Sequence, residues 1–461
     1  MPSVDDATHV RAAGVDAVTD DHGDESPAAP RRWVTSRPLE IAIGVALFVA
    51  AVVLPLLRQQ GVHTWDTIWA EDGQLYVDDI TRDGSVVVLL RGYAGYLQLS
   101  SRILAVPAAF IPAQHLATYL VGSAALVCAL LALFVYWASR SWVASRPVRI
   151  ALASLYVLQP ALGFENVGSA TNTIWTFAAV VPWALVGPIA RRRDVALCGG
   201  VAFLGVASTA LGLFFLPLGL VAALYRRTVA AWTVFGIYVA GCALQLGVMS
   251  HTHDQERGAF TNSPRELGNL VGAKVFGVFV AGPKAAGTLW TEHGRIFSTL
   301  AVVLVVLLLL VCQRGVDRDA KALAVLLVGS AIVLYAAPVW ARGTSNAHLI
   351  SGFWTDDGSR YSAIPVTLLG SAFAVLLAPV GRGYGRAVAV WGRRLLIAQI
   401  VVVAIVGFSI TNMRSNGPRW SESVASTAES KCRGVPPDTL VSVPITPPPW
   451  SALLRCSQLT G

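Results

Sequence analysis

Acidic residues are concentrated in one polar stretch, residues 65–84, which reads WDTIWAEDGQLYVDDITRDG. Glu71 and Asp72 stand near its middle between Trp69 and Tyr76, and the following Gly73 permits a tight turn. A carboxylate that aromatic neighbours partly remove from water has a raised pKa and can act as a general base. Glu71 and Asp72 are therefore candidate catalytic residues. The alternative is that both are ordinary acids of a solvated loop.

Basic side chains later in the sequence could bind an anionic group of a substrate. Residues 91–102, RGYAGYLQLSSR, are typical of a membrane interface, with tyrosines at headgroup depth, and they end in Arg102. Arg360 and Tyr361 open a later apolar segment. Arginine matches the geometry of phosphate with two parallel hydrogen bonds. Arg102, Arg360 and Tyr361 are therefore candidate substrate-binding residues, and the alternative is arginine side chains that reach the lipid headgroups.

A second polar segment, residues 163–175, reads GFENVGSATNTIW. We predict that Glu165 and Asn172 contact a substrate there and that Trp175 stacks on one of its rings. The alternative is local: Thr171 or Asn172 would suit the N-cap position of the next helix.

Two of the six cysteines, Cys432 and Cys456, lie in the polar C-terminal stretch, 24 positions apart. We predict a disulfide between them, because a segment too small to build a core gains from such a link outside the cell; the alternative is two free thiols. The other possible ligand cluster is His251, His253 and Asp254, and an HxH pair in a loop is a weak metal signal. We predict neither a metal site nor a cofactor.

The composition identifies the elements that must position these residues. Of the 461 residues 54% are hydrophobic and only 13% are charged, whereas soluble domains carry roughly 25% charged residues. Soluble enzymes and disordered proteins are therefore excluded. The apolar runs are continuous and do not alternate, which also excludes an outer-membrane barrel. The expected fold is an all-α polytopic membrane protein.

The apolar runs predict 11 transmembrane helices, near residues 38–57, 115–138, 149–163, 171–190, 195–210, 212–225, 229–249, 296–313, 322–341, 361–379 and 395–411. The stretch 96–112 is treated as interfacial, because basic loops then fall on the cytoplasmic side. The expected domains are a disordered cytoplasmic tail (1–37), a transmembrane domain (38–411) and an outer C-terminal segment (412–461). The long outer loops are 58–114, 250–295 and 342–360. The net charge of +8 fits basic cytoplasmic loops and needs no nucleic acid.

A polar first outer loop with an acidic pair, followed by interfacial helices, resembles the GT-C superfamily of membrane glycosyltransferases. The strings WAEDGQLY, YAGYLQLSSR and GFENVGSATNTIW, with the cysteine-bearing tail, also resemble a group of multi-pass proteins of high-GC Gram-positive bacteria. The resemblance implies a polyprenyl phosphate sugar as donor and a cell-envelope glycan or glycolipid as acceptor. It implies transfer at the outer face of the plasma membrane, with inversion at the sugar.

The resemblance also implies roles for single residues. Glu71 and Asp72 match the first-loop catalytic acid, Glu165 matches a second acidic position, and Arg360 with Tyr361 matches a basic and aromatic pair near the carrier phosphate. The chain lacks the large outer domain that often binds the acceptor in that superfamily.

Two other functions are compatible with a polytopic protein. A transporter or flippase of a lipid-linked substrate would carry ionisable residues in the middle of its spans, and the predicted spans hold few. A non-catalytic subunit of an envelope assembly machine needs no particular motif. These remain the alternatives to a glycosyltransferase.

Overall fold

The computed structural model is mostly helical, as the continuous apolar runs predict, and it describes residues 37–84, 87–163, 165–252, 262–343, 359–377 and 384–460. Within them, six helices are long and apolar enough to cross a membrane: Ala113–Ser141, Val229–His251, Pro264–His293, Arg295–Cys312, Arg318–Ala341 and Ala387–Val406. Shorter apolar helices accompany them at Ile41–Leu56, Leu99–Phe110, Thr173–Val186, Ala210–Arg226 and Arg360–Leu376. These helices identify a multi-pass membrane protein. Residues 1–36 of the predicted tail lie outside the described residues, as do His253 and Asp254.

The main helices are α1 (Arg37–Leu56), α4 (Ala113–Ala138), α5 (Arg146–Leu158), α6 (Thr173–Val186), α7 (Arg192–Ser208), α8 (Leu216–Arg226), α9 (Val229–His251), α12 (Arg295–Cys312), α13 (Arg318–Arg342), α15 (Ser359–Leu376) and α16 (Tyr384–Val406). Helix α13 packs on α15, α7 packs on both α6 and α9, and α4 packs on α5. The largest fully buried side chain of this core is Trp183, whose indole donates to the Tyr156 hydroxyl. The chain divides into two units, residues 1–44 and 45–461, and all the candidate site residues belong to the second.

The loop between α1 and α4, which the sequence predicts to be the first outer loop, contains short helices, namely η1 (Thr64–Asp66), η2 (Asp72–Val77), α2 (Asp78–Asp83), η3 (Val87–Leu90), α3 (Leu99–Ala105) and η4 (Val106–Phe110). The predicted interfacial stretch 96–112 corresponds to α3 and η4. Leu97 and Ala105 are buried there, whereas Ile103 and Phe110 are exposed. One apolar face is therefore available to lipid, as the interfacial assignment requires.

Residues 264–293 form a longer helical run than the interfacial piece that the sequence predicts over 269–284. The run comprises α10 (Pro264–Val271), η8 (Gly272–Gly277) and α11 (Val278–His293), and Ser263 caps its start by accepting from the Glu266 amide. It is kinked at Gly282, whose φ is +76°. Gly272 lies against Ser298 near the start of α12, and the other end of the run directly precedes Arg295. Both ends of the run thus lie beside the same end of α12, so the chain turns back on itself within residues 264–293.

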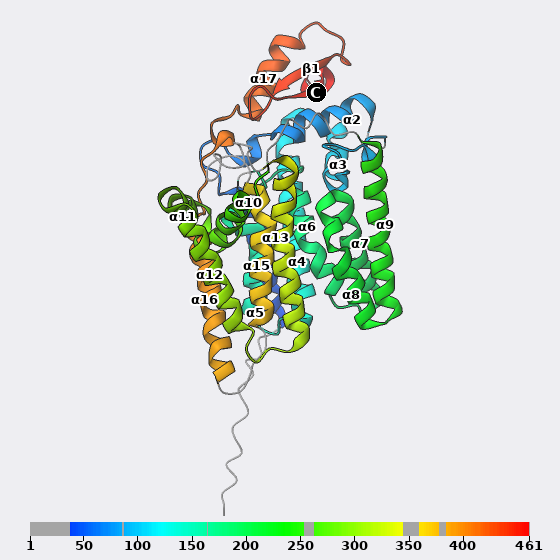
Figure 1. Cartoon of the computed structure of the whole chain (residues 1–461). Helices are drawn as coiled ribbons and strands as arrows, with labels where there is room; N and C mark the ends of the chain where they lie inside the picture. The colour runs from blue at the N-terminus through cyan, green and yellow to red at the C-terminus, as the bar shows by residue number, and fades with distance from the viewer. Residues whose placement is uncertain are drawn as a thin grey trace, which may run out of the picture. The chain divides into compact units, whose positions relative to one another are not determined.

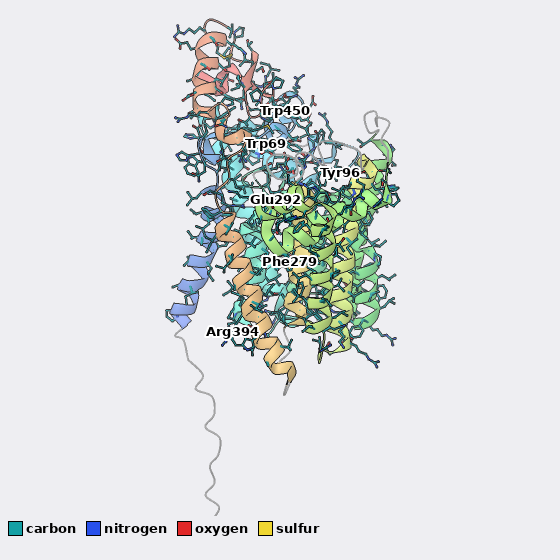
Figure 2. All side chains as sticks on the ribbon, turned by 60° about the vertical axis from the view of Figure 1, so that its left-hand side comes forward. Trp69, Tyr96, Phe279, Glu292, Arg394 and Trp450 are labelled. Atoms are coloured by element: carbon teal, nitrogen blue, oxygen red, sulfur yellow. A yellow bond between two sulfur atoms is a disulfide. The ribbon has the colours of Figure 1, made fainter. Side chains whose placement is uncertain are left out.

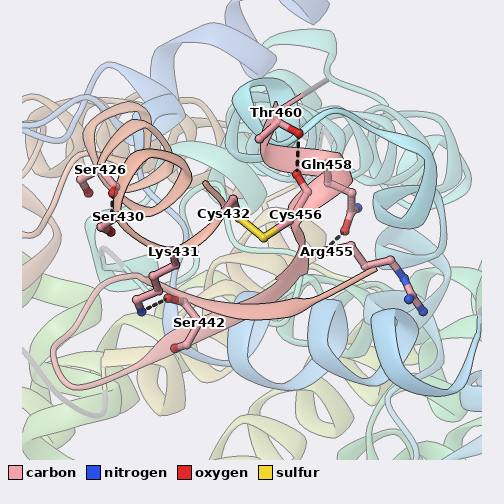
Figure 3. The surroundings of a disulfide bond; sticks show 9 residues. All are labelled: Ser426, Ser430, Lys431, Cys432, Ser442, Arg455, Cys456, Gln458 and Thr460. Atoms are coloured by element: carbon pink, nitrogen blue, oxygen red, sulfur yellow. Dashed lines mark hydrogen bonds between the residues drawn. A yellow bond between two sulfur atoms is a disulfide. The ribbon is translucent and has the colours of Figure 1, made fainter. Parts of the chain in front are cut away.

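The C-terminal cap, residues 412–460, contains α17 (Trp420–Lys431), the strands β1 (Leu440–Pro444) and β2 (Ser451–Arg455), and α18 (Cys456–Thr460). The strands pair antiparallel, from Leu440 opposite Arg455 to Pro444 opposite Ser451. A disulfide joins Cys432 to Cys456, the two cysteines that the sequence pairs (Figure 3). The cap lies at the same end of the helical bundle as α2 and α3 (Figure 1).

Candidate functional site

Asp72 links the two polar segments that the sequence identifies. It begins η2 and is buried. Its carboxylate accepts hydrogen bonds from the Thr171 amide at 2.6 Å, the Thr171 hydroxyl at 2.5 Å, the Ala170 amide at 3.1 Å and the Ser169 hydroxyl at 3.4 Å. Burial raises the pKa of Asp72 to about 6, although the Thr171 bonds and the charge of Arg414 act in the opposite direction. A carboxylate held by four donors is suited to fix the second segment rather than to accept a proton from a substrate.

Glu71 is differently placed, although it is the adjacent residue. It is only partly buried. Its Oε2 atom is removed from solvent and accepts no hydrogen bond from any residue that the structure describes. A buried carboxylate oxygen without a donor is costly, so such an oxygen needs an explanation in the structure. Of the two adjacent carboxylates, Glu71 is therefore the one with an oxygen that no described residue occupies.

Arg360, in the first turn of α15, pairs with Glu165 of the second polar segment. Its Nη1 lies 2.9 Å from Oε1 of Glu165, whose side chain is buried, whereas that of Arg360 remains 24% exposed. Arg360 also interacts electrostatically with Glu71. One edge of the guanidinium is thus fixed by Glu165, and the group still has access to solvent. Such a fixed, accessible guanidinium is suited to bind a phosphate.

Aromatic rings flank the ion pair. The Tyr361 ring centroid is 5.6 Å from the Arg360 guanidinium carbon, and the Trp175 ring meets the Tyr361 ring edge-on with centroids 5.4 Å apart. Four of the predicted substrate-binding residues, Glu165, Trp175, Arg360 and Tyr361, are therefore gathered in one place. Trp175 is buried against Tyr361, so its ring packs on protein in this structure.

Asn172 is buried behind this group and is hydrogen-bonded to two of its members, Glu165 and Trp175. Its Nδ2 donates to the Glu165 carbonyl at 2.8 Å, and its Oδ1 accepts from the Trp175 indole at 3.0 Å. Asn172 is the N-cap residue of α6, as the alternative interpretation expects, but its side chain makes no capping hydrogen bond, because both ends of the buried amide are occupied by these neighbours. Asn172 instead fixes Glu165 relative to Trp175.

The structure does not support the substrate-binding role that the sequence predicts for Arg102. The side chain is buried, its Nη1 pairs with Asp79 at 2.7 Å, and its Nε donates to the Arg91 carbonyl at 2.9 Å. It also lies 5.1 Å from the centre of the Tyr76 ring. These contacts bind α3 to α2 within the loop between α1 and α4, so Arg102 stabilises that loop and its buried side chain is not placed to receive a phosphate.

Arg414 was missed as a site residue by the sequence analysis. It is fully buried, and it donates to the Val167 carbonyl at 2.6 Å and to the Thr67 hydroxyl at 3.3 Å. Burial lowers the pKa of Arg414 to about 10, and Asp72 opposes that shift. Arg414 thus extends from the C-terminal cap and brings positive charge to both polar segments, through Thr67 in the first and Val167 in the second. Local sequence offered no signal for this role, since its contacts lie 247 and 347 positions away.

The site lies at one end of residues 45–461. Trp69, Tyr96 and Trp450 occupy this end, and Arg394 lies at the opposite end of the bundle (Figure 2). Among the described residues, no group of three His, Cys, Asp or Glu side chains could hold a metal ion. No protein-family model matches the chain, and no curated protein is similar to it.

Proposed function

We propose that the protein is a membrane glycosyltransferase of the GT-C type. It would transfer a sugar from a polyprenyl phosphate carrier to a glycan or glycolipid of the cell envelope, at the outer face of the plasma membrane. The observation that supports this proposal is the arrangement of Glu71 and Arg360. Oε2 of Glu71 has no hydrogen-bond partner among the described residues, Arg360 interacts electrostatically with Glu71, and Glu165 holds Arg360 in place.

In the proposed reaction, Glu71 takes the proton of an acceptor hydroxyl. The hydroxyl oxygen attacks the anomeric carbon, and the bond from that carbon to the phosphate oxygen breaks. Its electron pair leaves with the lipid phosphate, whose charge Arg360 stabilises. A single displacement of this kind inverts the configuration at the sugar. Asp72 contributes indirectly, because it holds the segment that carries Glu165.

We propose 11 spans, with the N-terminus in the cytoplasm and the C-terminus outside. The run 264–293 is not counted, because both of its ends lie beside the start of α12. An odd number of spans puts the Cys432–Cys456 disulfide outside the cell, where disulfides persist. The same orientation puts Glu71 and Arg360 where lipid-linked sugars would be presented.

The test is sugar transfer by purified membranes from a panel of radiolabelled polyprenyl phosphate sugars. We expect Glu71→Gln to lower kcat by roughly a hundredfold or more, because the base is lost. We expect a smaller loss for Asp72→Asn, which keeps one acceptor oxygen for Thr171. Asp83→Asn is the matched control, since Asp83 is an exposed acid of the same loop that pairs with Arg91.

Normal transfer by Glu71→Gln, with the protein inserted at wild-type level, would exclude Glu71 as the base. If the wild-type protein consumes no donor in the panel, the glycosyltransferase proposal is wrong. A non-catalytic assembly subunit would then be sought by crosslinking to partner proteins.

A further inference from the structure

The C-terminal cap is hydrogen-bonded to the backbone on both sides of Trp69. The Thr446 carbonyl accepts from the Ala70 amide at 2.6 Å, and the Thr446 amide donates to the Ile68 carbonyl at 3.1 Å. Thr446 and the Ile68–Ala70 backbone are fully or almost fully buried. Residues nearly at the end of the chain therefore fix the three residues that directly precede Glu71.

Ala70 has an unusual backbone conformation at this point. Its φ is +23°, a region that residues other than glycine rarely adopt. Such strained conformations persist only where the surrounding structure holds them, and they cluster at functional sites. The hydrogen bond from the Ala70 amide to Thr446 is one such restraint, and the turn it holds determines where the Glu71 side chain starts.

A second row of contacts fastens the other side of Glu71. The Ser451 amide donates to the Gln74 side chain at 3.3 Å, and the Leu453 amide donates to Asp78 at 2.5 Å. Gly73 faces Ile445 so closely that an added Cβ would lie 2.5 Å from its Cδ1 atom. Glu71 thus lies between two attachments to the cap, one at Thr446 in the connection between β1 and β2 and one at β2 itself.

The cap is itself anchored. The Cys432–Cys456 disulfide joins the end of α17 to the residue that follows β2 (Figure 3). At the other end of α17, the Trp420 indole donates to the Ala113 carbonyl at the start of α4, at 2.6 Å. The cap that holds the Glu71 segment is therefore attached to the helical bundle by the Trp420 hydrogen bond, and the disulfide fixes α17 to the end of β2.

We propose that the C-terminal cap is a positioning part of the active site, and that Thr446 holds the strained Ala70 turn so that Glu71 faces Arg360. This inference rests on the proposed glycosyltransferase function. Thr446 does not touch the reacting atoms; it acts through the backbone that carries the base.

The test uses two variants of the full-length protein in lipid nanodiscs. Ala70→Gly gives this position the wide conformational freedom of glycine, so it loosens the turn while its amide can still donate to Thr446 and the cap stays folded. Thr446→Pro removes the amide that donates to Ile68. Ala425→Gly, at an exposed position of α17, is the matched control for added glycine flexibility.

We expect both variants to lower kcat for sugar transfer roughly tenfold or more, with KM for the donor changed by less than about threefold, because a small displacement of a catalytic group has effects of this order. The control should transfer normally. We also expect amide hydrogen exchange over residues 68–74 to become faster in both variants. Because this exchange needs no substrate, its result is separate from any failure to find a sugar donor.

Two results would overturn the inference. In a protein that transfers sugar, wild-type kcat in Ala70→Gly would mean that the turn does not position the base. Unchanged exchange over residues 68–74 in Thr446→Pro would mean that Thr446 does not hold this segment.

Discussion

At the scale of single residues, burial separates acids that look equivalent in the sequence. Glu71 and Asp72 are neighbours, and the sequence identifies both as candidates without dividing their roles. The division comes from the segment 169–171, which lies up to 99 positions from Asp72 and occupies its oxygens. No local pattern contains that contact, so only the folded chain distinguishes the fixed carboxylate from the available one.

Asp78 offers a test of such burial by pH. Burial raises its pKa from 3.8 to about 6, while the hydrogen bond from Leu453 and the charge of Arg82 act in the opposite direction. Between pH 4 and 6 the folded protein therefore holds more protons at Asp78 than the unfolded chain does. The contribution of Asp78 therefore makes the protein's free energy of unfolding fall as pH rises through this range.

Asp78→Asn removes the titration and keeps an oxygen for the Leu453 amide. We expect the stability of this variant, relative to wild type, to rise between pH 4 and 6 and to level off above that range. Thermal unfolding in detergent, followed by tryptophan fluorescence at half-unit pH steps, measures the difference. Parallel curves for the two proteins would show that Asp78 titrates near its ordinary pKa.

At the scale of the elements, apolar runs predicted the helices well because each run has to become a hydrogen-bonded helix in lipid. A described helix overlaps every predicted span, including the short ones at α5, α7 and α8. The return of the run 264–293 was not predictable in this way. It depends on the kink at Gly282 and on close packing of Gly272 and Gly277 against α12, which hydropathy does not contain.

Arg58 shows how a single buried cation joins three elements. It follows α1 and donates to the carbonyls of Gly407 and Phe408 after α16, both at 3.2 Å, and to that of Gln159 after α5, at 3.4 Å. Burial lowers its pKa to about 10, so it remains charged at neutral pH. It satisfies carbonyls at two helix ends that have no partner within their own helices.

We expect Arg58→Met to lower the free energy of unfolding by roughly 2–4 kcal/mol, because one buried and two partly buried carbonyls lose a charged donor. Unfolding by a graded denaturing detergent, with the fluorescence of the native state as reference, measures this loss. Arg419→Met is the control, since Arg419 is an exposed residue with a single surface ion pair. An equal effect of the two substitutions would contradict the role assigned to Arg58.

At the scale of the whole molecule, the arrangement of residues 45–461 connects the charge pattern to a membrane orientation. Helix α7 carries a basic run, Arg191 to Arg193, at its start. At its other end, the Ser208 hydroxyl accepts a hydrogen bond from the Ser100 amide of the first outer loop. These ends are about 24 Å apart along a helix of this length, close to the roughly 30 Å of a bilayer core. The basic run and the candidate site should therefore face opposite sides of the membrane.

Single-cysteine labelling tests this orientation directly. Position 426 is exposed on α17 in the C-terminal cap, and position 193 is exposed at the start of α7. We expect Ser426→Cys to react with a membrane-impermeant maleimide in intact cells, and Arg193→Cys to react only after the membrane is opened. The positive-inside rule and the disulfide of the cap both lead to this result. Labelling of both positions from the same side would contradict the odd number of proposed spans between them, and labelling of Arg193→Cys alone in intact cells would reverse the orientation. Reversal would place Glu71 and Arg360 on the cytoplasmic face, so that outcome would count against the proposed function as well as the topology.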